Sequence, residues 1–137
     1  MTAALPAAFA PRLLGASQAV LDLHATWAWV VIVSNGLVGA WALAAHRWPQ
    51  LRHKALWWCT IAAEVAIFVQ VILGVILIQG KDKDAYGMHL LYGFSAAFAV
   101  GILYSYRNQL KGKEYLLYGC GGLFVMGLGL RAINVLP

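Results

Sequence analysis

Four long apolar stretches, separated by short polar segments, dominate the pattern of the chain. Each stretch is close to the roughly 20 residues that an α-helix needs to cross the hydrocarbon core of a bilayer. Backbone N–H and C=O groups in lipid must pair within their own segment, so these stretches predict helices rather than strands. They run from about Val20 to Ala45, Ala55 to Ile78, Tyr86 to Tyr106, and Tyr115 to Val135.

The three polar connections are short, which restricts how the helices can be arranged. They are HRWPQLRHK at 46–54, QGKDKDAYG at 79–87 and RNQLKGKE at 107–114. Short loops force consecutive helices to lie antiparallel. The sequence therefore predicts an all-α, integral membrane, up-down-up-down four-helix bundle over residues 20–137.

Residues 1–19 form a separate N-terminal segment that we expect to be extramembrane or interfacial. Leu5, Phe9 and Leu13 recur at steps of four, as on a short helix lying on a membrane. Pro6 and Pro11 favour a broken helix instead. No basic region precedes an apolar core here, so no cleavable signal peptide is expected.

Composition agrees with a membrane protein and argues against other classes. Of the 137 residues, 62% are hydrophobic and 11% are charged, whereas a soluble domain is about a quarter charged. Such a chain cannot cover its surface with polar groups, so it must face the lipid bilayer. The net charge of +5 lies mostly in the loops, where it sets topology, and we expect no nucleic-acid binding.

Lysine and arginine are divided unevenly between the two sides of the predicted bundle. Cytoplasmic loops carry the larger share of these residues, which places the first and third connections in the cytoplasm and both termini outside it. We therefore expect a bacterial inner membrane protein with extracytoplasmic termini. The first and third connections hold Arg47, Arg52, Lys54, Arg107, Lys111 and Lys113, and the other side holds Arg12, Lys81, Lys83 and Arg131.

Two of the four histidines lie inside predicted spans, at matching depths. His24 lies about four residues into the first span and His89 about three residues into the third. At 1.5 Å per residue, both are about one turn below the outer surface. The first and third helices are diagonal in such a bundle, so the two imidazoles would face each other across its centre. Iron in a b-type heme takes one imidazole on each axial side.

Other residues at this level fit a pocket for a flat macrocycle. Ala28 and Gly93 lie one turn further in than the two histidines and leave room for it. Gln70 lies close to the same depth. Arg131, near the outer end of the fourth helix, would pair with heme propionates or extend to lipid headgroups. The plain alternative for His24 and His89 is a structural or proton-handling role without any cofactor.

Glu64 is the most costly polar residue of the spans. A charge at mid-bilayer costs about 2.5 to 3.5 kcal/mol on insertion scales. Ser34 and Asn35 lie at similar depth on the first helix and are candidate hydrogen-bond partners. Glu64 would act either in proton transfer or quinone binding, or as an interhelical polar clamp.

The stretches around the two histidines resemble one half of heme A synthase. The resemblance covers residues 18–131 and rests on His24, on QVILG at 70–74 and on MHLLYG at 88–93. That family has two four-helix halves, each with a histidine pair on alternate helices near the outer face. The resemblance implies heme binding by His24 and His89. The chain has one half rather than two, and no acidic residue stands in a recognisable outer-loop motif.

The sequence thus predicts a membrane b-type heme protein that carries electrons through one non-covalent, bis-histidine heme b. We expect an electron carrier or a respiratory-complex subunit rather than a stand-alone enzyme, with no catalytic residues. Candidate partners are a quinone and other membrane subunits, and self-association into a homo-oligomer is left open. Two alternatives stand beside it: a cofactor-free accessory subunit of a larger membrane complex, and a heme-processing protein similar to heme A synthase.

Overall fold

The computed structural model describes residues 10–137, and over this range the chain is helical without a strand. The four helices are α1 (Ala10–Arg47), α2 (Lys54–Leu77), α3 (Gly87–Tyr106) and α4 (Glu114–Asn134), with a short 3-10 helix, η1, at Pro49–Leu51. Each of the four is long and apolar enough to cross a membrane. For residues 10–137, the prediction of an all-α fold with four such helices is therefore confirmed.

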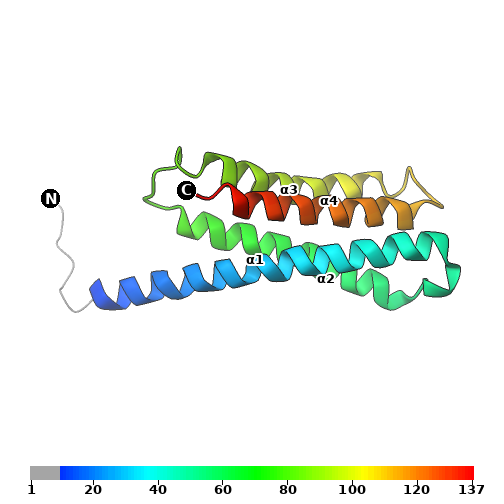
Figure 1. Cartoon of the computed structure of the whole chain (residues 1–137), viewed down its shortest axis with the longest axis horizontal. Coiled ribbons are helices and arrows are strands. Elements are labelled where there is room, and N and C mark those ends of the chain that lie inside the picture. The colour runs from blue at the N-terminus through cyan, green and yellow to red at the C-terminus, as the bar shows by residue number, and fades with distance from the viewer. Residues whose placement is uncertain (1–9) are drawn as a thin grey trace.

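The four helices lie side by side, and consecutive helices run in opposite directions (Figure 1). α1 packs most extensively against α4 and then against α2, and α3 packs against α4. α2 and α3 make much the sparsest contact among neighbouring helices. α1 and α3 therefore lie diagonally, and the seam between α2 and α3 is the loosest part of the structure.

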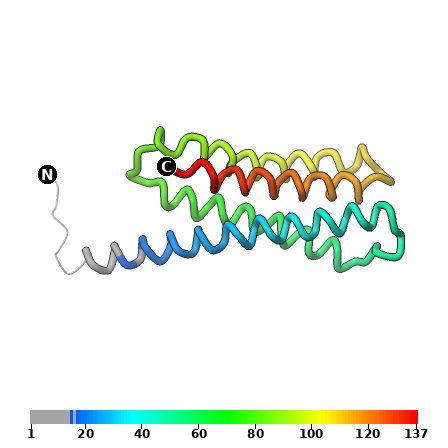
Figure 2. Tube along the Cα trace, in the orientation of Figure 1, coloured from blue at the N-terminus to red at the C-terminus, as the bar shows by residue number. Residues whose placement is uncertain are grey.

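Helix α1 begins ten residues before the predicted start at Val20. Pro11 does not break it, because proline is tolerated in the first turn, where backbone N–H groups have no helical partner. The N-terminal part of α1 that is drawn in blue projects beyond the ends of the other helices (Figure 2). Leu5 and Phe9 of the predicted interfacial face lie outside the described residues, so the structure does not test this face.

Large apolar side chains cover much of the outer surface of the helices. Leu37 is 67% exposed and Phe98 is 73% exposed, and both lie in the middle of their helices. The buried core is made of smaller side chains from all four helices. The core cluster consists of Val31, Ala66, Ile67, Ala96, Ala99, Val100 and Val125. An apolar exterior around a core of small residues is typical of helices that pack in lipid.

Glycines bring α1 and α4 into backbone contact. A Cβ atom added to Gly122 would lie 2.8 Å from the carbonyl oxygen of Asn35 and 2.9 Å from Cα of Gly39. One added to Gly39 would lie 2.8 Å from the backbone nitrogen of Leu123. Real Cβ atoms essentially never approach other atoms this closely. Only glycine fits at this crossing, which fixes α4 against α1.

Asn35 joins α1 to α2 by a buried hydrogen bond. Its Nδ2 donates to the backbone oxygen of Ala63 at 3.1 Å and to that of Val31 at 2.9 Å. We expect Asn35→Leu to lower the free energy of unfolding by about 0.6 kcal/mol and by at most about 1.7 kcal/mol, the average and the largest values measured for interhelical hydrogen bonds in a membrane protein. Unfolding in mixed micelles measures this change.

Ser34→Ala is the matched control for this substitution. The Ser34 hydroxyl bonds only to Val31 of its own helix, at 3.3 Å, so its removal should leave the unfolding free energy almost unchanged. Equal effects of the two substitutions would contradict an interhelical role for Asn35.

Candidate functional site

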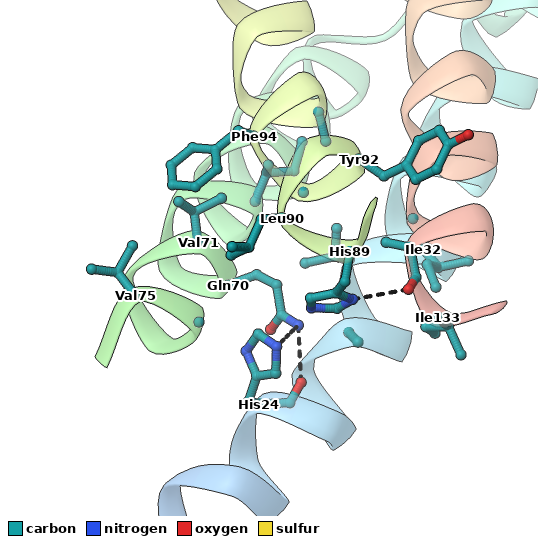
Figure 3. Close-up of a pocket in the computed structure, with 18 residues that line it drawn as sticks. His24, Ile32, Gln70, Val71, Val75, His89, Leu90, Tyr92, Phe94 and Ile133 are labelled. Carbon is teal, nitrogen blue, oxygen red and sulfur yellow. Dashed lines mark hydrogen bonds between the residues drawn. The ribbon is translucent and has the colours of Figure 1, made fainter. Parts of the chain in front are cut away.

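The imidazoles of His24, on α1, and His89, on α3, extend toward one another from diagonal helices (Figure 3). Their ring centroids are 6.0 Å apart and their planes meet at 69°. Both side chains are half-buried. The structure thus brings together the two histidines that were paired from the sequence because they lie at matching depths.

The two rings border a cavity of about 80 Å³ between the four helices. Its walls are almost entirely apolar, and polar side chains reach it chiefly from His24, His89 and Gln70. Ala28 and Gly93 also line the cavity, so five of the six site residues predicted from the sequence meet here.

Glycines leave the space that the rings occupy. A Cβ atom added to Gly74 would lie 3.2 Å from Cε1 of His24, so the missing side chain makes room for that imidazole. A Cβ atom added to Gly93 would meet nothing within 4 Å, so empty space adjoins Gly93 in the cavity wall. The site is therefore shaped by absent side chains as well as by present ones.

The hydrogen bond of His89 determines which of its ring nitrogens is free. Nδ1 lies 2.9 Å from the backbone oxygen of Ala132, on α4. A carbonyl oxygen can only accept, so Nδ1 must carry the hydrogen. In the neutral ring, Nε2 then keeps its lone pair, and this is the state in which histidine binds a metal through Nε2.

Gln70 places His24 in the same tautomer by a different contact. Its amide nitrogen donates to the backbone oxygen of His24 at 3.0 Å, which fixes the orientation of the amide. The same nitrogen lies 3.4 Å from Nε2 of His24. Because the amide nitrogen can only donate, Nε2 of His24 must be the acceptor and Nδ1 must carry the hydrogen. Both histidines therefore present a lone pair on Nε2.

Arg131 is the predicted site residue that does not line the cavity. Its side chain is exposed, and its guanidinium carbon lies 5.9 Å from the ring centroid of Tyr92. Tyr92 is a wall residue of the cavity. Arg131 therefore lies outside the cavity, next to Tyr92. It lies at the level of the histidines, because the next residue, Ala132, is the hydrogen-bond partner of His89.

Glu64 lies outside the site, half-buried on α2. Its two predicted partners bond elsewhere: Ser34 and Asn35 both donate to backbone oxygens. At this depth Asn35 makes the interhelical hydrogen bond between α1 and α2. Amide and hydroxyl groups find backbone acceptors at close range, which depth along a helix alone does not reveal.

Two further contributors were not predicted as site residues. Gly74 ends the QVILG stretch one turn after Gln70, so a signal for it was present. The Ala132 carbonyl has no such signal, because any residue provides a backbone oxygen.

Comparison with known proteins adds no family: no protein-family model, curated protein or solved structure matches the chain. The resemblance to one half of heme A synthase therefore rests on the short stretches around His24, Gln70 and His89 alone.

Proposed function

We propose that this chain is a membrane-embedded b-type heme protein in which His24 and His89 are the two axial ligands. The observation that carries the proposal is the meeting of two imidazoles from diagonal helices. Each imidazole carries its hydrogen on Nδ1 and keeps a lone pair on Nε2. Imidazole pairs of this kind hold a heme iron from both sides.

The distance between the rings supports this ligand arrangement. A metal–imidazole nitrogen bond is about 2 Å long, taking zinc as the guide. Two imidazoles on opposite sides of one iron then have ring centroids about 6 Å apart, because each centroid lies roughly 1 Å behind its nitrogen. The observed separation of 6.0 Å agrees with this value.

The number of protein ligands favours heme over a bare metal ion. Structural zinc sites use four protein ligands and catalytic ones use three. Within residues 10–137, no three His, Cys, Asp or Glu side chains come together. A porphyrin supplies four nitrogens of its own, so two imidazoles complete the coordination of its iron.

The cavity must widen to admit a porphyrin, which is far larger than 80 Å³. The sparse contact between α2 and α3 supplies the place where widening is easiest. The cavity reaches this seam through Val71 and Val75 of α2 and Leu90 and Phe94 of α3 (Figure 3). Apolar side chains there suit the faces of a macrocycle.

In this proposal the four helices form an up-down-up-down bundle that spans a bacterial inner membrane with both termini outside. Heme b supplies reversible one-electron chemistry, and with two axial ligands it offers no open position for oxygen. The chain then passes electrons between a quinone or a partner subunit and an outer acceptor. Arg131, Lys81 and Lys83, at the outer end, are the cations available to propionates.

Optical spectroscopy of the detergent-purified protein tests the proposal. We expect a sharp α-band in the reduced-minus-oxidised spectrum and about one heme b per chain in a pyridine hemochrome assay, since one pair of imidazoles holds one iron. A folded, colourless protein that takes up no added heme would contradict the proposal and favour the cofactor-free accessory subunit. Hydroxylated heme products would favour the heme-processing alternative.

A further inference from the structure

Two buried polar atoms in the site have no hydrogen-bond partner. They are Nδ1 of His24 and Oε1 of Gln70, and within the described residues no other buried side-chain nitrogen or oxygen stands alone. A buried group left unsatisfied costs about 1 to 3 kcal/mol. The two atoms belong to side chains that already touch, through the 3.4 Å approach of the Gln70 amide nitrogen to Nε2 of His24.

The two unpartnered atoms are chemically complementary. Nδ1 of His24 carries a hydrogen in the tautomer that Gln70 imposes. Oε1 of Gln70 can accept a hydrogen bond and cannot donate one. In the structure they do not meet, because the amide nitrogen occupies the other side of the ring. The arrangement therefore changes if something else takes Nε2 of His24.

We propose that Gln70 is the positioning residue of His24, with a separate contact in each state of the site. In the heme-free protein its amide nitrogen holds His24 in the Nδ1–H tautomer. Once Nε2 binds iron, the amide turns about its terminal torsion, which has a broad energy profile, and Oε1 accepts the Nδ1 hydrogen. This inference rests on the proposed heme function for its second state only.

The turn exchanges one hydrogen bond of the amide for another. Turning about this torsion moves the amide nitrogen together with Oε1, so the 3.0 Å contact to the backbone oxygen of His24 is exchanged for the bond between Oε1 and the Nδ1 hydrogen. The bound state then matches the His89 side, where the Ala132 oxygen already accepts the Nδ1 hydrogen at 2.9 Å. Metal-bound histidines nearly always donate their second nitrogen in this way.

An acceptor on Nδ1 makes the imidazole a stronger electron donor to the metal. The oxidised iron benefits more than the reduced iron because it carries the higher charge. We therefore expect Gln70→Leu to raise the reduction potential of the heme and to weaken heme binding about 10-fold or more, the usual effect of losing such a partner. Gln70→Glu should lower the potential, since a carboxylate accepts more strongly.

The matched control is Gln79→Leu. Gln79 lies two residues after the end of α2, is exposed, and donates its side-chain hydrogen bond to the backbone oxygen of Val75. We expect this variant to keep the wild-type potential and heme affinity. A potential in Gln70→Leu equal to that of wild type and of Gln79→Leu would overturn the bound-state role.

A second measurement reads the heme-free state directly. Nitrogen-15 NMR of the histidine rings in heme-free protein should show His24 as Nδ1–H in wild type and a rising Nε2–H population in Gln70→Leu. The His89 signal, set by Ala132, should stay unchanged in both and so reports an intact fold. An unaltered His24 tautomer in Gln70→Leu would overturn the heme-free role.

The two measurements separate this inference from the proposed function. If wild-type protein binds no heme, the proposed function and the bound-state role fail, and the NMR result alone decides whether Gln70 sets the tautomer of His24. If wild type binds heme and the Gln70 variants match it in potential and tautomer, the inference fails and the heme proposal stands.

Discussion

Replacing His89 by alanine is expected to abolish stable heme binding. The substitution removes one of the two proposed axial nitrogens and leaves the Ala132 carbonyl, 2.9 Å from Nδ1 of His89, without its donor. Loss of a partner behind a metal ligand weakens binding by about 10- to 100-fold, so loss of the ligand itself should exceed 100-fold. Titration of heme into the detergent-solubilised, heme-free variant measures the change in dissociation constant.

Two comparisons make this result specific. His46→Ala removes an exposed histidine at the end of α1, far from the site, and should bind heme as wild type does. Added imidazole should restore part of the six-coordinate spectrum in His89→Ala, because it can enter the space that the side chain leaves. A His89→Ala protein with the wild-type spectrum and affinity would show that His89 is not an axial ligand.

The second large effect is expected at the glycine crossing of α1 and α4. In Gly122→Val the new Cβ would meet the Asn35 oxygen at 2.8 Å and Cα of Gly39 at 2.9 Å. Neither neighbour is a flexible side-chain end, so the helices must separate. Overpacking of this kind costs about 1 to 3 kcal/mol or more, and we expect the upper end because backbone atoms are involved on both sides.

Gly127→Val is the control on the same helix, since a Cβ at Gly127 meets nothing within 4 Å. The loss of unfolding free energy relative to wild type, measured in mixed micelles, should be several-fold larger for Gly122→Val than for Gly127→Val. Gly122→Val should also lose heme, because α4 carries the Ala132 acceptor of His89. Equal stability of the two variants would contradict the close approach of α1 and α4.

Helix positions followed from the sequence wherever the change from apolar to polar residues is abrupt. The predicted stretch Ala55–Ile78 became Lys54–Leu77, and Tyr115–Val135 became Glu114–Asn134. The first apolar span was predicted from about Val20, whereas the helix that contains it begins at Ala10, because residues 10–19 are helical without being strongly apolar. They include good helix formers such as Ala, Leu, Arg and Gln.

The site was predictable in depth but not in rotation about each helix axis. Residue counting placed His24 and His89 at one level, and diagonal helices then brought them together. It also placed Arg131 at that level, yet the side chain is exposed beside Tyr92. The direction in which Arg131 points depends on how α4 packs. The packing of α4 is decided by glycine contacts to backbone atoms, and such contacts leave little trace in the hydrophobic pattern.

The unequal packing of the four helices has a consequence for how the site is filled. α1 and α4 are locked by backbone contact, and they carry His24 and the acceptor for His89. α2 and α3 barely touch and are lined with valine, leucine and phenylalanine. We expect a ligand to enter the site laterally from the lipid, by separation of α2 from α3, while α1 and α4 stay in contact. This route does not pass through water.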